Sequence, residues 1–234
     1  MNTEEQLSIN NENSVHRILK TNIKIDPNSN EDEIIFGCGC FWGAEKCFWK
    51  LPGVITTSVG YAGGDKTNPT YYEVCSGLTG HSEVVRIIWN KNEIDISDLL
   101  KMFWECHDPT QKNRQGNDIG TQYRSAIYYK NDTNKKIIFA SKEEYQKELN
   151  KKNLGLIETE IKMIDTYFYA EKYHQQYLAS PGSRQYCSAS PTKVKLGNFT
   201  GSNYKLKDHI WESFDWQVDK CVLRSDNKPI KNNF

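Results

Sequence analysis

The sequence lacks an excess of charge of either sign, and it lacks any long hydrophobic run. Its 234 residues include 30 Lys and Arg and 30 Asp and Glu, so the formal net charge is zero. A neutral chain gives no support for a nucleic-acid or acidic-membrane partner, because both favour a basic surface. No apolar run approaches the roughly 20 residues of a membrane-spanning helix. The N-terminus has no apolar signal core, and the acidic Glu4 and Glu5 argue against a transit peptide. We therefore expect a soluble, cytoplasmic protein.

The sequence also lacks the regular cysteine spacing of a secreted, disulfide-bonded protein. Its seven cysteines are an odd number at irregular intervals. A hydrophobic content of 37% is sufficient for the core of one domain. Residues 1–31 are rich in Asn, Glu and Ser, so we expect a flexible N-terminal extension. We expect the compact domain over residues 32–187. Residues 188–234 then form a C-terminal extension, partly docked because its later part regains Trp and Phe.

The most informative cysteine is Cys40, which lies between a strand pattern and a helix pattern. The apolar run 33–37 predicts a buried strand, and residues 44–50 predict a helix that ends at a Pro-Gly turn. A helix N-terminus offers unpaired N–H groups and a positive dipole end, both of which favour the reactive thiolate. Phe41 and Trp42 follow directly. The pattern therefore predicts a reactive sulfur beside an aromatic pocket.

Strand and helix patterns alternate along the rest of the chain, without an internal repeat. We expect strands over 54–61, 81–89, 122–129 and 157–164, and helices over 98–107, 134–151 and 171–178. Ser97 and Thr133 are the predicted N-caps of the first two of these helices, and residues 65–80 are expected to be mainly loop. This order predicts an α+β fold: a two-layer sandwich of helices on a mixed sheet, with a ferredoxin-like (plait) core and a long, loop-rich tail.

Short blocks of Gly, aromatic and polar residues follow one another through the compact domain. They are Gly39-Cys40-Phe41-Trp42-Gly43, Leu51-Pro52-Gly53-Val54, Gly60-Tyr61-Ala62-Gly63-Gly64, Asn68-Pro69-Thr70-Tyr71, Val74-Cys75-Ser76-Gly77, Thr79-Gly80-His81-Ser82-Glu83, His107-Asp108-Pro109, Gln115-Gly116-Asn117-Asp118, Gly120-Thr121-Gln122-Tyr123-Arg124-Ser125 and Tyr173-His174-Gln175-Gln176-Tyr177-Leu178. In this order, over about residues 33–187, they resemble the peptide methionine sulfoxide reductase A family. The resemblance implies a monomeric enzyme that reduces the S epimer of methionine sulfoxide, free and in proteins, and so repairs oxidative damage. It implies no bound cofactor or metal, and thioredoxin as reductant.

Sulfoxide reduction needs a nucleophile for sulfur and proton or hydrogen-bond donors for oxygen. The resemblance implies that Cys40 attacks the sulfur, that Glu83 is the acid, and that Tyr71 and Tyr123 donate hydrogen bonds to the oxygen. An apolar surround is expected to raise the pKa of Glu83, so that it carries a proton near neutrality. As substrate contacts, the resemblance implies that Phe41 and Trp42 hold the methyl group and that Asp118 helps to orient the substrate. An ordinary structural role stays open for each acid and phenol, and Asp118 is also typical of a turn.

A second cysteine must then resolve the sulfenic acid as a disulfide. The resemblance implies Cys187, which lies in a Ser- and Pro-rich segment that we expect to be mobile. Whether Cys221 relays the disulfide further stays open. Cys38 departs from the family pattern, and we favour a packing role because a buried cysteine behaves as a small hydrophobe. Packing is also expected for Cys47, Cys75 and Cys106, and structural hydrogen bonding for His81, His107 and His174.

Two other classes of function are less consistent with the sequence. Cys38 to Trp42 is similar to the papain-type cysteine motif, with His174 downstream, but the two cysteines are one residue too close and no Asn-Ser-Trp follows the histidine. A zinc module of Cys38, Cys40 and Cys47 lacks a paired Cys-x-x-Cys set, and the aromatic pair would crowd a tetrahedral site.

Overall fold

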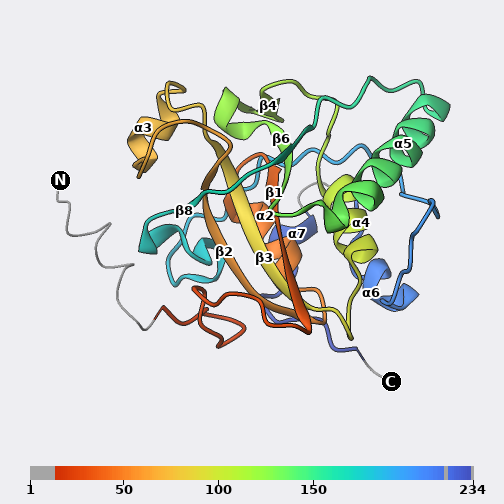
Figure 1. Ribbon diagram of the computed structural model, residues 1–234, viewed down its shortest axis with the longest axis horizontal. Coiled ribbons are helices and arrows are strands. Elements are labelled where there is room, and N and C mark those ends of the chain that lie inside the picture. Colours follow the sequence, from red (N-terminus) through yellow and green to blue (C-terminus); the bar gives the residue numbers. More distant parts are fainter. Residues whose placement is uncertain (1–13, 219–220, 233–234) are drawn as a thin grey trace.

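A six-stranded mixed sheet forms the centre of the molecule (Figure 1). The computed structural model describes residues 14–218 and 221–232. The strand order is β7-β6-β1-β3-β2-β8, and β6 and β7 pair in parallel, whereas the other neighbours are antiparallel. The strands are β1 (Glu31–Cys38), β2 (Val54–Ala62), β3 (Ser82–Asn90), β6 (Ser125–Tyr129), β7 (Glu160–Met163) and β8 (Tyr167–Tyr169). The predicted mixed sheet with packed helices is confirmed.

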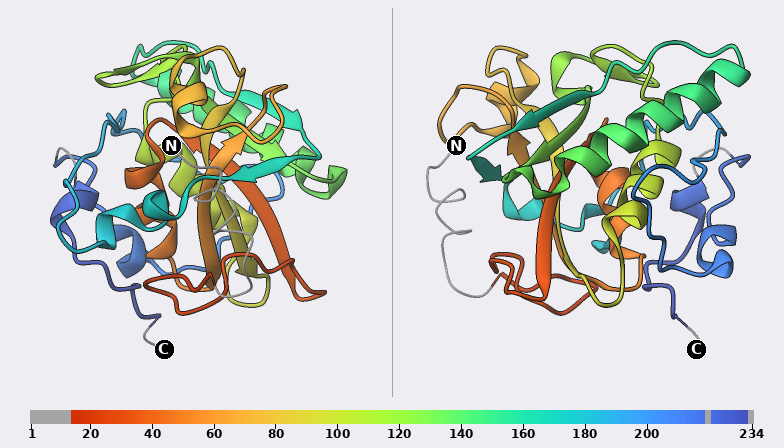
Figure 2. Two further views of the ribbon diagram at one scale, coloured as in Figure 1. Left: turned by 90° about the vertical axis from the view of Figure 1, so that its left-hand side faces the viewer. Right: turned by 45° about the vertical axis from the view of Figure 1, so that its right-hand side comes forward.

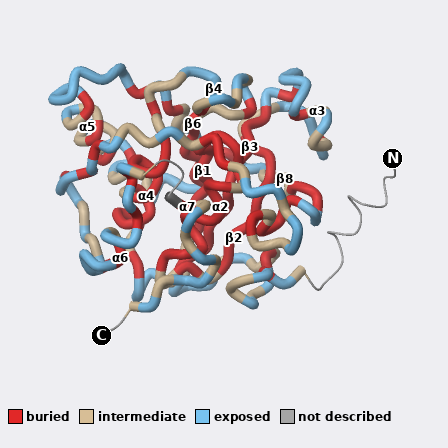
Figure 3. Tube along the Cα trace, turned by 180° about the vertical axis from the view of Figure 1, so that it is seen from behind, coloured by how far each residue is buried: buried red, intermediate tan, exposed pale blue. Residues whose placement is uncertain are grey.

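Helices α2 (Phe41–Trp49) and α4 (Ile96–Cys106) pack on one face of this sheet, and α5 (Lys135–Lys151) packs against α4 (Figures 1 and 2). Strand alternation explains the two faces: Ile34 and Phe36 enter the large core under the helices, whereas Ile35 enters a smaller cluster. Figure 3 shows that burial is greatest where the central strands meet α2. None of the described helices is long and apolar enough to span a bilayer.

The remaining elements are short. They are α3 (Tyr71–Cys75), β4 (Arg114–Gln115), β5 (Asp118–Ile119), η2 (Thr121–Tyr123), η3 (Asp132–Asn134), η4 (Lys172–His174), η5 (Tyr177–Ala179), α6 (Asp208–Glu212) and α7 (Cys221–Arg224). Both predicted N-caps are wrong. Asp95 caps α4 in a capping box with Asp98, and Asn134 is the N-cap residue of α5, without a side-chain hydrogen bond. The loop expected over 65–80 contains α3, which a second capping box starts, formed by Thr70 and Glu73.

The predicted helix over 171–178 is also wrong. Two separate 3-10 turns replace it, and Gln176 between them has a left-handed φ of 49°. The Gln175 side chain explains this, because it accepts from Val59 N at 2.9 Å and donates to Val59 O at 2.8 Å and Ala170 O at 2.9 Å. These hydrogen bonds tie the segment to β2 in a form that a continuous helix does not allow.

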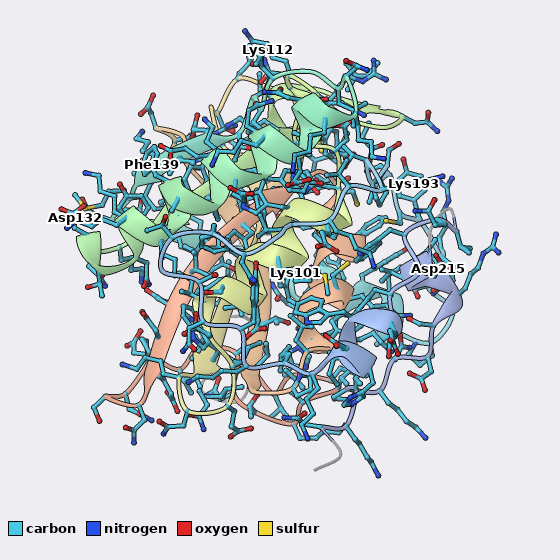
Figure 4. The ribbon with its side chains drawn as sticks, turned by 90° about the vertical axis from the view of Figure 1, so that its right-hand side faces the viewer. Lys101, Lys112, Asp132, Phe139, Lys193 and Asp215 are labelled. Atoms are coloured by element: carbon cyan, nitrogen blue, oxygen red, sulfur yellow. The ribbon has the colours of Figure 1, made fainter. Side chains whose placement is uncertain are left out.

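The two chain extensions lie against this core in their described parts. His16, fully buried, hydrogen-bonds to Thr57 Oγ1 at 2.9 Å. In the C-terminal extension, Leu196 N donates to Glu105 on α4 at 2.9 Å, and Lys46 of α2 donates to Ser225 O at 2.8 Å. Figure 4 shows this segment passing beside α4 at Lys101, whose Nζ donates to Leu196 O at 3.2 Å. The extension thereby covers the outer sides of α4 and α2 (Figure 2).

Candidate active site

Cys40 is the N-cap residue of α2 and follows β1 after one turn residue, as the strand and helix patterns predict. The turn requires Gly39, because its φ of +85° is left-handed and a side chain there would meet Gln115. The Trp42 backbone N–H lies near the Cys40 sulfur and favours its charged form, but the Cys40 side chain forms no hydrogen bond that caps the helix. The cysteine is only 9% exposed. The sulfur therefore lies at a helix N-terminus but at the edge of the buried core.

This burial changes the acidity expected of Cys40. Burial raises the pKa of the thiol well above its usual range, the neighbouring Glu83 adds to the increase, and the nearby backbone N–H of Trp42 only partly opposes it. The prediction that the helix N-terminus makes Cys40 a thiolate is therefore wrong for the free protein. The favourable dipole contributes about 1 kcal/mol or less in exposed sites, which is smaller than the cost of an ion in an apolar site. Cys40 is a protonated thiol at rest.

Glu83 lies on β3, with its side chain buried against the start of α2. Its Oε2 accepts a hydrogen bond from Phe41 N at 3.1 Å. Burial raises the pKa of Glu83 to about 8, and the charge of Asp118 adds to the increase. The direction of the predicted pKa shift is therefore confirmed, and the Glu83 carboxyl carries a proton near pH 7. A proton donor therefore lies beside Cys40.

Tyr71 and Tyr123 reach the same place from α3 and η2, and both are half-buried. Burial raises the pKa of each phenol above its usual range, and the nearby Glu83 raises both further. The two hydroxyls therefore keep their protons at any physiological pH. Together with Glu83, they supply three O–H donors around one small region.

Phe41 and Trp42 form part of an aromatic wall. The Trp42 ring stacks on Tyr177 with centroids 3.9 Å apart, and its Nε1 donates to His174 Nδ1 at 3.1 Å. The His174 ring also contacts Phe41 and Tyr71, with centroids at 5.2 Å and 4.6 Å. Burial lowers the pKa of His174 to about 4, so the imidazole is neutral. The expected structural role of His174 is confirmed, because it supports the wall.

Asp118 lies at β5, opposite a residue that the sequence analysis missed. Its Oδ1 accepts from the Tyr186 hydroxyl at 2.5 Å, whereas its buried Oδ2 has no hydrogen-bond partner. Tyr186 directly precedes Cys187, and this position was the available signal. The unpaired oxygen gives the site one acceptor for an N–H group of a ligand.

Glu171 is a second residue that sequence reasoning missed. It is buried, and it accepts hydrogen bonds from Tyr61 Oη at 2.8 Å and from Tyr71 N at 2.9 Å. It therefore fixes the start of α3, which carries one of the two phenols. The false helix prediction over 171–178 hid this role, because it placed the residue in a helix.

Cys187 is buried in the structure, although we expected a mobile thiol. Its sulfur lies against the Cα of Gly43 on α2, where any side chain on residue 43 would collide with it. It is close enough to Cys40 to raise the pKa of that thiol. Cys221 starts α7, but its side chain lies outside the described part of the chain. Of the cysteines expected to pack, Cys38, Cys47 and Cys106 are buried, and Cys75 is exposed instead.

The two rival sites do not form in the described residues. His174 accepts its hydrogen bond from Trp42, rather than pairing with Cys40 as a protease base. Among the described residues, the one group of three potential metal donors is Cys38, Cys106 and His107, not the proposed set of Cys38, Cys40 and Cys47.

Comparison with known proteins is consistent with this geometry. The profile of the family "Peptide methionine sulfoxide reductase" matches residues 32–206. Peptide methionine sulfoxide reductase MsrA of Vibrio vulnificus is 52% identical over 180 residues, which cover 77% of this chain and 86% of the relative. MsrA of Azotobacter vinelandii is 57% identical over 165 residues, which cover 70% of this chain and 76% of the relative.

Solved structures of methionine sulfoxide reductases are also similar to this chain. Methionine sulfoxide reductase A of Corynebacterium diphtheriae has a TM-score of 0.66 and 37% identity, and the match covers 84% of this chain and 97% of that one. Reduced Mxr1 from Saccharomyces cerevisiae has a TM-score of 0.62 and 31% identity, with coverage of 75% and 97%. This chain therefore belongs to the peptide methionine sulfoxide reductase family and is an oxidoreductase that reduces methionine sulfoxide.

Proposed function

We propose that this protein reduces the S epimer of methionine sulfoxide, free and in proteins, through a sulfenic acid on Cys40. The observation that carries the proposal is the buried Glu83 carboxyl, with its pKa raised to about 8, next to the N-terminus of the helix that Cys40 caps. A buried carboxyl that is neutral near pH 7 can act as a proton donor. The choice of the S epimer follows from the family resemblance.

The first step needs no net proton. The Cys40 sulfur bonds to the substrate sulfur while Glu83 gives its proton to the sulfoxide oxygen. The protonated oxygen then passes to Cys40, methionine leaves, and the Cys40 thiol proton returns to Glu83. A thiol and a sulfoxide thus become a sulfenic acid and a thioether. Tyr71 and Tyr123 remain protonated throughout and donate hydrogen bonds to the oxygen.

The neutral resting state suits this step. A thiolate and a carboxylate in contact would repel each other in a medium of low dielectric constant. Because the thiol and the acid both start neutral, charge develops only when the sulfoxide bridges them. Phe41 and Trp42 hold the substrate methyl group, and Asp118 accepts from the substrate through its unpaired Oδ2.

The second step forms a disulfide. Cys187 attacks the sulfenic sulfur of Cys40, an S–S bond replaces the S–O bond, and water leaves. Its place against Gly43, on the first turn of the helix that Cys40 caps, supports this pairing. Thioredoxin then reduces the disulfide and returns both thiols. A cavity of about 330 Å³, lined by Cys187, Gly116 and Trp216 among others, supports access from the tail side. We place this cycle in the cytoplasm, in a monomer that repairs oxidised proteins.

The decisive experiment compares the wild type with Cys40→Ser in the absence of any reductant. Each variant is mixed with the separated S and R epimers of N-acetyl-methionine sulfoxide, and the thioether is measured by chromatography. We expect the wild type to release thioether from the S epimer only, and Cys40→Ser to release none. Thioether release by Cys40→Ser at the wild-type rate would refute the proposal, and release from the R epimer would refute the assigned stereochemistry.

A further inference from the structure

Glu45 is a buried carboxyl group to which the catalytic cycle gives no role. It lies on α2, three residues after Trp42, and its side chain is fully buried. Its Oε1 accepts hydrogen bonds from Gln176 Nε2 at 2.7 Å and from Thr57 Oγ1 at 3.0 Å, and its Oε2 accepts from Gln176 N at 2.8 Å. Both oxygens are engaged, and two of these three hydrogen bonds come from the same residue. The carboxyl group therefore fastens Gln176 to the helix that Cys40 caps.

Gln176 needs such a restraint because its backbone is left-handed. Its φ of 49° and ψ of 43° lie in a region that residues other than glycine seldom occupy. A conformation of this kind persists only where surrounding groups hold it. Besides its two hydrogen bonds to Glu45, Gln176 accepts one at Oε1 from Arg17 N, at 3.1 Å. Glu45 is therefore the acceptor for both the backbone donor and the side-chain donor of Gln176.

The turn at Gln176 determines where the aromatic wall of the active site lies. Tyr177, the next residue, stacks its ring on Trp42 with centroids 3.9 Å apart. His174, two residues before the turn, accepts a hydrogen bond from Trp42 Nε1 at 3.1 Å. Because these two residues flank Gln176 in the sequence, a displacement of the turn would move both rings that hold the Trp42 side chain.

The N-terminal extension supports Glu45 through Thr57. His16 Nδ1 accepts from the backbone N–H groups of Ile18 and Leu19 at 3.1 Å and 3.0 Å, and burial lowers the pKa of His16 to about 3. The neutral imidazole therefore carries its proton on Nε2, which donates to Thr57 Oγ1 at 2.9 Å. The Thr57 hydroxyl donates its own proton to Glu45. This part of the extension precedes the family match, so a segment outside the region of family similarity reaches the support of the active site.

We propose that Glu45 is a positioning residue, which holds the turn at Gln176 and thereby keeps Trp42 in place for the methyl group of the substrate, while His16 supports it through Thr57. The inference rests on the role of Trp42 in the proposed function. It predicts an effect on substrate binding rather than on the chemical step, because Glu45 acts through the aromatic wall and not on the reacting groups.

The arrangement requires a carboxylate at position 45. An amide has one oxygen and two N–H donors. In Glu45→Gln, the amide group must therefore set a donor either against Gln176 N, or against Gln176 Nε2 and the Thr57 hydroxyl. Exchanging the two residues, with Glu45→Gln and Gln176→Glu together, returns one carboxylate and one amide to the pair. The amide oxygen then accepts from the backbone N–H of residue 176, and the amide N–H donates to the carboxylate at position 176.

The test measures single-turnover release of thioether from the S epimer of N-acetyl-methionine sulfoxide over a range of concentrations. The pH lies between the pKa of Glu45, which burial raises to about 7, and that of Glu83, about 8. Glu45→Gln should raise the half-saturating concentration about tenfold and leave the limiting rate within about threefold of the wild type. The exchange variant should return the half-saturating concentration to within about threefold of the wild type. Glu143→Gln, at an exposed position of α5, is the matched control and should match the wild type.

His16 provides a second, milder pair of variants. His16→Asn keeps an acceptor near the place of Nδ1 for the N–H groups of Ile18 and Leu19, but it loses the contact with Thr57. His16→Gln keeps a donor that reaches Thr57 and loses the acceptor of the turn. We expect His16→Asn to raise the half-saturating concentration about threefold and His16→Gln to leave it within about twofold of the wild type. The opposite order would overturn the support by His16.

The outcomes separate positioning from packing. A lower free energy of unfolding in Glu45→Gln, with an unchanged half-saturating concentration, would leave Glu45 a structural role only and overturn the proposal. A rise that the exchange variant does not reverse would overturn the route through Gln176. If neither variant folds, the His16 pair decides, and equal half-saturating concentrations in both of its members would overturn the proposal. A wild type that releases no thioether would instead refute the proposed function.

Discussion

Two kinds of segment meet at the active site, and they contribute different things. The regular elements β1, α2 and β3 hold Cys40 and Glu83. The two residues are 43 positions apart in the sequence, yet the Glu83 side chain on β3 reaches the start of α2, where Cys40 lies. The irregular segment 170–190 holds Glu171, His174, Tyr186 and Cys187, all at least 80 residues further along the chain. The first region brings the proposed nucleophile and the proposed acid together. The second supports the aromatic wall and carries Cys187, the proposed resolving thiol.

Substitutions in the two regions should therefore impair the enzyme in different ways. A change in the sheet or helix removes a reacting group and slows the reduction itself. A change in the irregular segment leaves the chemistry possible but loosens its alignment or blocks recycling. The following variants test this division.

Cys187→Ser should have the largest effect of all the variants, and only on the steady-state rate of thioredoxin-driven turnover. Thioredoxin-driven turnover should be abolished, because no disulfide can form with Cys40. A single turnover, measured as the first equivalent of thioether, should keep its rate within about threefold, since the variant retains a small polar side chain against Gly43. Normal turnover with thioredoxin would show that another cysteine resolves the sulfenic acid.

Glu83→Ala should have the largest effect on the chemical step. Loss of the proton donor is expected to reduce the single-turnover rate by about 10³-fold, as for other positioned acids and hydrogen-bond donors. Glu83→Gln should lose less, because an amide N–H still donates to the oxygen. Glu143→Gln, at an exposed position of α5, serves as the matched control. An alanine variant as fast as the control would remove Glu83 from the mechanism.

The pH dependence follows from the pKa of Glu83, which is about 8. Below that value the carboxyl carries its proton and can act as the acid. As the pH rises through about 8 the proton is lost, so the single-turnover rate should fall by roughly tenfold for each further pH unit. In Glu83→Gln this decline should disappear, because the amide does not titrate. An identical decline in both proteins would assign it to another group.

The regular region was also the more predictable one. The apolar run of β1, the period-two alternation of β3 and the apolar face of α4 were visible in the sequence, and these three elements formed where they were expected. The position of Cys40 at the helix start followed from local patterns. The protonation state of its thiol could not be predicted in this way, because burial outweighs the helix dipole and depends on chain segments that a local pattern does not contain.

The irregular region was predicted poorly for a physical reason. Its conformation depends on hydrogen bonds to distant partners, such as Gln175 with Val59 and Glu171 with Tyr61, which are at least 110 residues apart in the sequence. These hydrogen bonds outweigh the helix-like spacing of residues over 171–178. The family resemblance implied a role for Cys187, and only the position of Tyr186 directly before it pointed to that tyrosine. No pattern indicated that Glu171 holds its neighbours in place.

A smaller effect is expected for Glu171→Gln. The carboxylate accepts from both Tyr61 Oη and Tyr71 N, and a single amide oxygen is a poorer acceptor for both donors. The free energy of unfolding, measured in urea, should fall by about 1–3 kcal/mol, the cost of a buried donor left unpaired. The single-turnover rate should fall by about tenfold, because Tyr71 loses its anchor at the start of α3. Lower stability with an unchanged rate would show that Glu171 does not position the phenol.

The smallest effect should come from Tyr186→Phe, which removes the hydroxyl that donates to Asp118 Oδ1. The carboxylate then loses one of its restraints, and we expect the KM for an N-acetyl-methionine sulfoxide to rise about threefold to tenfold, which corresponds to roughly 1 kcal/mol. The kcat should change little, because Tyr186 does not touch the reacting atoms. Tyr177→Phe is the matched control, since its ring still stacks on Trp42. A fall in kcat with an unchanged KM would mean that Tyr186 acts on Cys187, its neighbour in the chain, rather than on substrate binding.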